Sequence, residues 1–320
     1  MKHHFGDFLD REGDYWHLIP NAKRWAYHHG DLTEAPANTD ILTLTRNDKN
    51  WRYVTRLEHL RELTLHEPSR EQLECVDELT NLRRLRITHA QPKNLNFLTN
   101  LNDLQELVLE YVSGIEELSA VGNLPKLRSL HLENLRRVKD FSGLQSSGSL
   151  RYISVDGTMD WRQPIETMDF LASIRTIEVL RLMAVRLLSP YPVFASLVEA
   201  PRLRKVVIAM NAVELKDFAY LHARRPDVDG AVRPAFVFHD AERRPVHPRD
   251  IRFRMPEAEF LKITRALIDD EGHRFIDQPS RAFLLGKGAR YVEGERHKVE
   301  DACRVHAEQY EHLIAEQRSR

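Results

Sequence analysis

Apolar residues recur along this chain in the motif L-x-x-L-x-L, where x is any residue and some copies have another apolar residue in place of leucine. The last two apolar residues alternate with one x, and the first lies three residues before the second. The clearest copies read LRELTL, LRRLRI, LQELVL and LRSLHL, and they begin at Leu60, Leu82, Leu104 and Leu127. Alternation places two apolar side chains on one face of a short strand, whereas an amphipathic helix needs offsets of three and four. Each copy therefore predicts a short strand with one buried face.

Weaker copies extend the pattern: LRYISV from Leu150, IEVLRL from Ile177 and LRKVVI from Leu203. From Leu60 onward, the copies start 22, 22, 23, 23, 27 and 26 residues apart. A nearly constant spacing of this length indicates a solenoid, whose units stack because none can bury its apolar side alone. We expect TDILTLTRN and RPAFVFHD, around Leu42 and Phe236, to form less regular first and last coils.

The segments between the strands show a second spacing. Leu95, Leu98, Leu101 and Leu104 follow one another at every third position, which suits a 3₁₀-like or extended return. The two longer returns, TMDFLASIRT and PYPVFASLVEA, have apolar residues three and four apart and predict short α-helices. Pro192 is expected in the first turn of the second helix.

These copies make the chain resemble the leucine-rich repeat proteins, specifically the short-repeat type of bacterial internalins and of a regulatory subunit of protein phosphatase 1. The resemblance covers roughly residues 39–240 and implies an α/β solenoid with a parallel concave sheet, 3₁₀ or short α-helical returns, and caps at both ends. The chain departs from the family at one position. An asparagine three residues after the last motif leucine is present only at Asn47 and Asn211, so other groups must satisfy the backbone of the interior turns.

We expect three parts: an N-terminal cap at 1–38, the solenoid at 39–240 and a small helical C-terminal domain at 241–320. Aromatic residues in the first part would cover the open apolar end of the first coil. In the last part, the stretch PEAEFLKITRALIDDEG and the segment from Val299 to Ile314 have apolar residues at helical spacing.

Charge and composition narrow the classes of function. Lys and Arg number 47 against 48 for Asp and Glu, a balance that disfavours nucleic acid or an anionic membrane as a partner. The first residues lack the apolar core of an export signal, and no uncharged stretch is long enough for a bilayer. The two cysteines, Cys75 and Cys303, lack the paired spacing of a disulfide framework or zinc site. We therefore expect a cytoplasmic protein, bacterial by its resemblance, and the oligomeric state stays open.

Catalytic constellations are not found in the sequence, and we expect no enzyme activity, no cofactor and no metal site. Gly286-Lys287-Gly288, with Arg290 and Arg296 nearby, is a weak candidate for binding an anion, although it lacks the full spacing of a phosphate loop. An ordinary turn is the favoured interpretation of these residues. The alternative function is that the C-terminal region binds or processes an anionic small molecule.

Equivalent strand positions of a solenoid lie about 4.8 Å apart, so the concave face is organised in columns of side chains. The residue before the second motif leucine begins the column Glu62, Arg84, Glu106. Charges that alternate in this way form a ladder of ion pairs that fold stability alone explains.

The residue after the last motif leucine is acidic in three consecutive coils, at Glu110, Glu133 and Asp156, a set that we name the acidic column. Like charges on adjacent strands are destabilising, so fold stability does not explain this column. We expect it to receive a basic segment of a protein partner. Three alternatives remain: the side chains extend into water, they pair with Arg128 or Arg151, or they bind a divalent cation.

The sequence thus predicts a protein-interaction scaffold whose rigid concave face lowers the entropy lost on binding. The expected partner-binding residues are Arg84, Arg86, Glu110, Tyr111, His131, Glu133, Asn134, Tyr152, Asp156 and Arg181. Immunity protein, enzyme regulator and adaptor are all compatible with this prediction. A secreted effector with the same fold is a further alternative.

Overall fold

A computed structural model describes residues 27–263, 265–289 and 291–319 of the chain. The described chain forms two compact units. The first consists of the chain up to Val213 together with Arg224–Val232, and the second consists of Glu214–Ala223 together with the chain from Arg233 onward. Most of the expected N-terminal cap, residues 1–26, lies outside the described residues.

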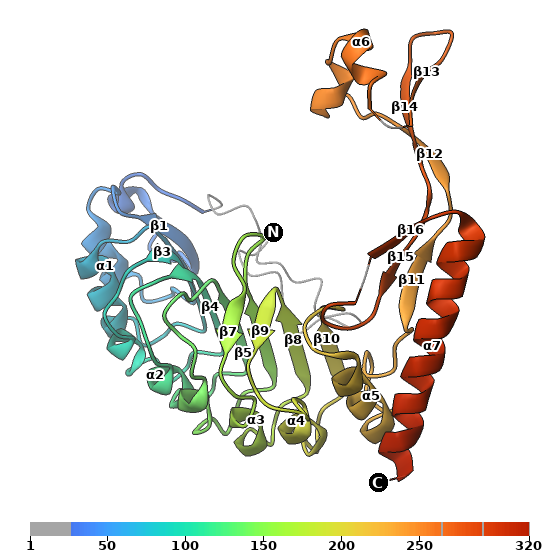
Figure 1. Ribbon diagram of the computed structural model, residues 1–320. Helices are drawn as coiled ribbons and strands as arrows, with labels where there is room; N and C mark the ends of the chain where they lie inside the picture. Colours follow the sequence, from blue (N-terminus) through green and yellow to red (C-terminus); the bar gives the residue numbers. More distant parts are fainter. Residues whose placement is uncertain (1–26, 264, 290, 320) are drawn as a thin grey trace. The chain divides into compact units, whose positions relative to one another are not determined.

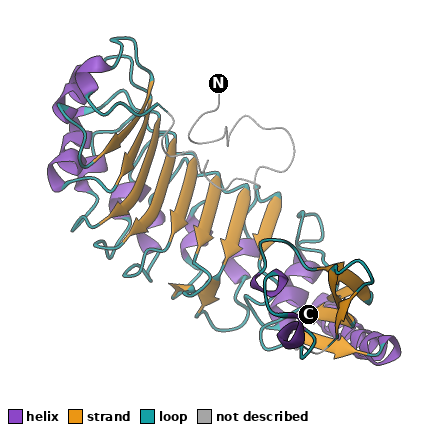
Figure 2. Cartoon of the chain, turned by 90° about the horizontal axis from the view of Figure 1, so that it is seen from above, coloured by secondary structure: helices purple, strands orange, loops and turns teal. Residues whose placement is uncertain are grey.

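The first unit contains one sheet of eight parallel strands, which lie side by side (Figures 1 and 2). In spatial order they are β1 (Ile41–Thr45), β2 (Glu62–His66), β3 (Arg84–Ala90), β4 (Glu106–Val112), β5 (Ser129–Glu133), β6 (Tyr152–Asp156), β8 (Val179–Met183) and β10 (Lys205–Ile208). The register pairs Leu63 with Leu85 and Leu85 with Leu107, which are equivalent motif positions. The predicted stacking of repeats into an α/β solenoid is confirmed.

The motif leucines form a continuous core behind this sheet. Leu63, Leu85 and Leu107 are at most 1% exposed. Burying each such side chain stabilises the fold by about 1.5–3 kcal/mol. Because each coil contributes the same positions, the core is a stack of leucine layers.

The returns are short, as predicted. Their elements are η2 (Trp51–Arg56), α1 (Arg70–Glu74), η3 (Cys75–Glu78), η4 (Asn96–Leu98), α2 (Ser119–Gly122), η5 (Ser142–Leu144), α3 (Phe170–Ser173) and α4 (Ala195–Val198), and η1 (Leu32–Glu34) precedes the first strand. The two longer returns contain the expected α-helices, α3 and α4. The expected place of Pro192 is wrong, because Val193 and Phe194 form a turn before α4 begins at Ala195.

The longer spacing of these coils has a structural cause. They carry two additional strands, β7 (Gln163–Ile165) and β9 (Val185–Leu187), which pair in parallel as a separate two-stranded sheet.

Five turns of the solenoid use a left-handed residue at the same position. The residue two positions after the last motif leucine has a positive φ in five coils: Glu67 at 48°, His89 at 57°, Tyr111 at 56°, Asn134 at 55° and Ala184 at 48°. Only Asn134 is a residue type that adopts this conformation readily. In these five coils the conformation turns the strand into its return at the same motif position.

Buried glutamines hydrogen-bond the backbone of two turns, one of which has Leu135 in place of the family asparagine, whereas the other keeps it as Asn47. Gln163 is 1% exposed, accepts a hydrogen bond from the amide of Leu135 at 2.9 Å and donates to the carbonyl of Val138 at 2.7 Å. Gln72 donates to the carbonyl of Thr45 at 2.8 Å in the same manner. Both glutamines bridge neighbouring coils and thereby pair backbone groups that burial would otherwise leave unsatisfied.

The second unit is a mixed α/β structure. Its elements are α5 (Leu215–Arg224), β11 (Phe236–His239), β12 (Glu242–Pro245), η6 (Ile251–Phe253), α6 (Glu257–Phe260), β13 (Ala266–Ile268), β14 (Arg274–Gln278), β15 (Ser280–Leu284), β16 (Tyr291–Gly294) and α7 (Arg296–Ser319). The strands form two antiparallel sheets, β11-β15-β16 and β12-β14-β13. The expectation of a helical domain therefore misses these sheets.

The predicted C-terminal helix is confirmed as α7, which buries Val299, Cys303, Tyr310 and Ile314. The other predicted helix is wrong in most of its length, because only Glu257–Phe260 is helical and the rest of the stretch leads into β13. Pairing of β13 with β14 overrides the local helical spacing.

The strand around Phe236 is also not the last coil of the solenoid. It is β11, which pairs antiparallel with β15 and belongs to the second unit. Alternating apolar residues predict a strand but do not specify its pairing partner, which is the physical reason for this error.

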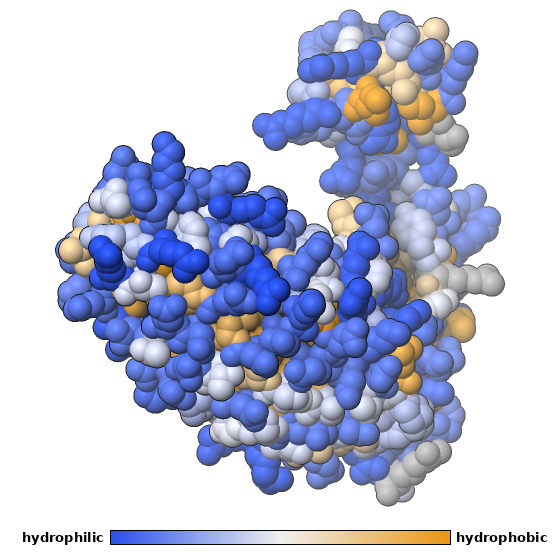
Figure 3. All heavy atoms as spheres, turned by 90° about the vertical axis from the view of Figure 1, so that its left-hand side faces the viewer, coloured by the Kyte–Doolittle hydropathy of each residue, from blue (hydrophilic) through white to orange (hydrophobic). Residues whose placement is uncertain are grey.

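Hydrophilic residues predominate on the face that Figure 3 shows, and apolar atoms are scattered among them. Among the described helices, none combines the length and the apolar character that crossing a bilayer requires.

Candidate functional site

The concave face of the first unit displays the strand residues that alternate with the core leucines. Its central positions are aligned by the register into a row that we name the middle column: Arg86, Val108, His131, Ser154 and Arg181. The acidic column lies next to it along the ends of the strands. Functional side chains therefore come from rigid strands rather than from loops.

The ladder at the other end of the strands forms as predicted. Arg84 donates to Glu62 at 2.7 Å and to Glu106 at 3.1 Å. Burial of Glu106 raises its pKa to about 7, although Arg84 acts in the opposite direction. One guanidinium thus serves two carboxylates, and the fold alone accounts for this group of residues.

The acidic column has the predicted register, with Glu110 opposite Glu133 and Glu133 opposite Asp156. Arginines of the middle column neutralise two of its members. Arg86 donates to both oxygens of Glu110, at 2.8 and 3.0 Å, within a buried pair, and Arg181 donates to Asp156 at 2.5 Å. Burial raises the pKa of Asp156 against the effect of Arg181.

The arginines considered from the sequence bind elsewhere. Arg128 donates to the side chain of Gln105 at 2.7 Å, and Arg151 forms an ion pair of 2.6 Å with Glu178. Pairing of the acidic column with these two residues is therefore wrong. The actual partners lie on neighbouring strands in the adjacent column, within diagonal reach on the same face.

His131 is 4% exposed and contacts one residue of the middle column and one of the acidic column. Its Nδ1 lies 3.0 Å from Oγ of Ser154, and its Nε2 lies 3.7 Å from a carboxylate oxygen of Glu133. These are the residue types of a Ser-His-Glu triad. However, Ser154 is 1% exposed and accepts a hydrogen bond from Arg181 at 3.2 Å, so its hydroxyl is held within the network rather than presented to a substrate.

The same residues include possible metal ligands. Glu110, His131 and Glu133 offer three ligand atoms that lie within 4.8 Å of one another. An imidazole and two carboxylates suit a divalent transition metal. Arg86 already binds both oxygens of Glu110, and its positive charge would repel a cation at this position. The arrangement therefore favours a hydrogen-bonded network over a metal centre.

A pocket of about 440 Å³ opens where the strand ends meet the turns. Five of the predicted residues contribute to its lining, namely Tyr111, His131, Glu133, Asp156 and Arg181. Two methionines that we did not predict, Met159 and Met183, also line it. Met183 follows Asp156 in the same column, so the column signal could have found it, whereas nothing in the repeat pattern points to Met159.

The other predicted residues have different positions. Tyr152 is buried against Val179, and Asn134 is buried at a left-handed turn position. Arg84 belongs to the ion-pair ladder described above. Together with Arg86 and Glu110, these residues support the concave surface from below rather than line the pocket.

Two of the candidate anion-binding residues in the second unit, Lys287 and Arg296, lie near carboxylates. Lys287 lines a pocket of about 920 Å³ together with two carboxylates. Arg296 forms ion pairs of 2.9 Å with Asp240 and 2.6 Å with Glu300. Arg290 lies outside the described residues.

Strand register, leucine layers and short returns together decide the architecture. The chain folds as a leucine-rich repeat solenoid of the short-repeat type. No protein-family model matches the sequence, and no curated protein matches it either. The repeat itself therefore carries the fold assignment.

Solved structures that the chain is similar to include three bacterial repeat proteins. Internalin C2 of Listeria monocytogenes is 20% identical, with 54% of this chain and 70% of that chain covered and a TM-score of 0.38. Internalin F of the same organism is 14% identical, with 68% and 70% covered and a TM-score of 0.38. A leucine-rich repeat protein of Leptospira interrogans is 14% identical, with 63% and 68% covered and a TM-score of 0.31.

Proposed function

We propose that the protein is an interaction scaffold whose concave pocket binds a basic segment of a partner protein. The observation that carries the proposal is the pocket in which Glu133 and Asp156 lie beside His131 on neighbouring rigid strands. A rigid surface of this kind costs little entropy when it binds an extended segment.

The charges of the site favour a basic group. The acidic column has three carboxylates, and the middle column supplies two arginines, Arg86 and Arg181. These two columns therefore contain one more carboxylate than guanidinium group, and Glu133 is one of the carboxylates that border the pocket. A lysine or arginine of the partner would balance this charge, and an arginine can form two parallel hydrogen bonds with a carboxylate. The chain's net charge of -1 likewise favours a protein over nucleic acid.

The apolar part of the lining suits a peptide. Tyr111 provides an aromatic surface with a polar end, and such residues are enriched in interface hot spots. Met159 and Met183 provide flexible side chains that adapt to a partner's shape. The expected binding segment thus has a basic residue next to an apolar one.

The test is a charge reversal at Glu133, a carboxylate that lines the pocket. We expect Glu133→Lys to abolish co-purification of a protein that the wild type retains from the native cell extract. The purified pair should then show a loss of affinity of at least about tenfold by biolayer interferometry, because the reversal places like charges in contact.

Glu199→Lys is the matched control, since Glu199 is exposed at the end of α4 and the substitution changes the charge equally. Equal melting temperatures of the three proteins would show that the fold is intact. Retention of the same partner by Glu133→Lys, at unchanged affinity, would disprove binding at this pocket.

The location that we propose is the cytoplasm, where a bacterial regulator or adaptor would meet its partner. Both cysteines are buried and free of disulfide bonds, as a reducing compartment requires. Fractionation of the native cells tests the location, and recovery of the protein from the culture medium would instead favour the secreted effector.

A further inference from the structure

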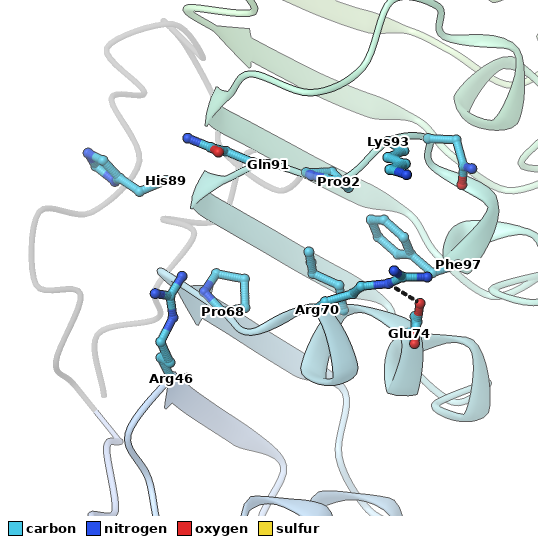
Figure 4. A pocket seen from close by; sticks show the side chains of 11 residues that line it. Arg46, Pro68, Arg70, Glu74, His89, Gln91, Pro92, Lys93 and Phe97 are labelled. Atoms are coloured by element: carbon cyan, nitrogen blue, oxygen red, sulfur yellow. Dashed lines mark hydrogen bonds and ion pairs between the residues drawn. The ribbon is translucent and has the colours of Figure 1, made fainter.

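A second pocket of the solenoid, of about 530 Å³, lies beside the turns that follow β1, β2 and β3 (Figure 4). Its charged side chains are Arg46, Arg70, Lys93 and Glu74. The volume is in the range of pockets that hold small ligands or a few residues of a peptide. None of the proposed concave-site residues lines it.

The pocket has an excess of positive charge. Glu74 is the single carboxylate in its lining, and it is held by Arg70 through an ion pair of 2.8 Å, which Figure 4 shows as a dashed line. The side chains of Arg46 and Lys93 form no hydrogen bond or ion pair with the part of the chain that the structure describes. Two positive side chains without a partner among the described residues therefore line a pocket of a chain whose net charge is -1.

The rest of the lining is suited to a polypeptide. Leu73 and Phe97 are largely buried and offer apolar surface at the base of the pocket. Gln91 and Asn94 are exposed amides on the lining, and amide side chains can pair with the donors and acceptors of a peptide backbone. An apolar residue flanked by acidic residues matches this combination of surfaces.

One pair of stacked rings joins a residue of this pocket to a residue of the concave pocket. The ring of His89, which lines the basic pocket, stacks on the ring of Tyr111 with centroids 4.7 Å apart and an interplanar angle of 3°. Tyr111 in turn lines the concave pocket. Both residues occupy the left-handed turn position of adjacent coils. Their two stacked rings, which we name the aromatic pair, link the linings of the two pockets.

From these observations we infer that the pocket beside α1 binds an acidic segment of a protein partner, with carboxylates placed between Arg46 and Lys93. This site goes beyond the proposed concave site and does not depend on it. A partner that occupies both pockets would place a basic residue in the concave pocket, on one side of the aromatic pair, and acidic residues in the pocket beside α1, on the other side.

A labelled peptide tests the inference with the full chain. Fluorescence anisotropy would compare a fluorescein-labelled Glu-Glu-Phe-Glu peptide with its Gln-Gln-Phe-Gln counterpart at low ionic strength. We expect the acidic peptide to bind more tightly, and the double variant Arg46→Glu, Lys93→Glu to weaken it by about tenfold or more. Glu74→Gln should strengthen binding by about twofold to threefold, because it removes the only carboxylate of the lining.

The matched control is Arg175→Glu, Arg202→Glu, which makes the same charge change in the turns before β8 and β10, at the opposite edge of the sheet. This control should bind the acidic peptide like the wild type. Equal binding of the two peptides, equal losses in both double variants, or displacement of the acidic peptide by millimolar inorganic phosphate would each overturn the inference.

These measurements can contradict either proposal without contradicting the other. Glu133→Lys should leave the affinity for the acidic peptide unchanged, because Glu133 does not line the basic pocket. Loss of partner capture in Glu133→Lys alone would support the concave site and say nothing against the peptide result.

Discussion

At the scale of single residues, this solenoid places charged groups on a buried surface and pairs them across coils. Arg84 is shared between Glu62 and Glu106, and Oε2 of Glu106 has no hydrogen-bond partner among the described residues. Desolvation therefore outweighs the attraction of the guanidinium, which explains why the pKa of Glu106 rises to about 7. A buried carboxylate that shares its cation costs stability when it is ionised.

This residue predicts a pH dependence. The folded chain keeps the proton of Glu106 to about pH 7, whereas the unfolded chain releases it near the ordinary pKa of 4.5. The folded state binds more protons in this window, so the free energy of unfolding should fall as pH rises from 4.5 to 7, by up to about 3 kcal/mol. In Glu106→Gln this part of the pH dependence should be missing, as measured by urea unfolding at several pH values.

Glu199→Gln is the control for Glu106→Gln, because it removes a carboxylate at an exposed position. Parallel stability curves for Glu106→Gln and the wild type between pH 4.5 and 7 would contradict the assignment.

At the scale of elements, a buried glutamine completes a turn of this solenoid in which Leu135 stands where the family has an asparagine. Gln163 comes from the additional strand β7 and reaches two backbone groups of the preceding coil, at Leu135 and Val138. Gln163 therefore stabilises the turn of the preceding coil although it does not lie at a position of the repeat motif. This arrangement makes the stability of one turn depend on a residue of the next coil.

Gln163→Leu retains most of the side-chain volume but leaves the amide of Leu135 and the carbonyl of Val138 without their partner. We expect the free energy of unfolding to fall by about 2–4 kcal/mol, since each buried unsatisfied group costs about 1–3 kcal/mol. Gln145→Leu, at an exposed position, should change it by less than about 0.5 kcal/mol. Urea unfolding of both variants measures the difference, and similar small effects would show that the bridge does not stabilise the turn.

At the scale of the whole chain, the repeat makes stability a property of neighbouring coils. Within the eight-stranded sheet, each strand pairs with the strands beside it. A local defect should therefore spread to adjacent coils and weaken with distance along the stack.

Leu130→Ala in β5 tests this expectation, because Leu130 is fully buried in an interior coil. Large-to-small core substitutions of this kind cost about 2–5 kcal/mol. Amide hydrogen exchange followed by mass spectrometry should show lost protection in β4, β5 and β6 and little change in β1. Leu42→Ala in β1 is the control, and its effect should be confined to β1 and β2. A uniform loss along the sheet in both variants would mean that the solenoid unfolds as one cooperative unit.

Much of the candidate site could be predicted from the sequence, because a column of side chains follows directly from the repeat spacing. Five of the ten predicted residues line one pocket, and the acidic column has the expected register. The part that could not be predicted concerns side-chain geometry. Tyr152 is buried against its neighbour, and Met159 enters the pocket from a turn that the repeat does not constrain.

By itself, the sequence determined the strands, their parallel stacking and the leucine core of this protein, because alternation and a fixed period act locally and repeat in every coil. The tertiary structure alone decided that Arg86 and Arg181 neutralise the acidic column and that Gln163 completes a turn. It also decided that β11 pairs with β15. These outcomes depend on which groups of distant segments come within hydrogen-bonding reach, and neither composition nor spacing contains that information.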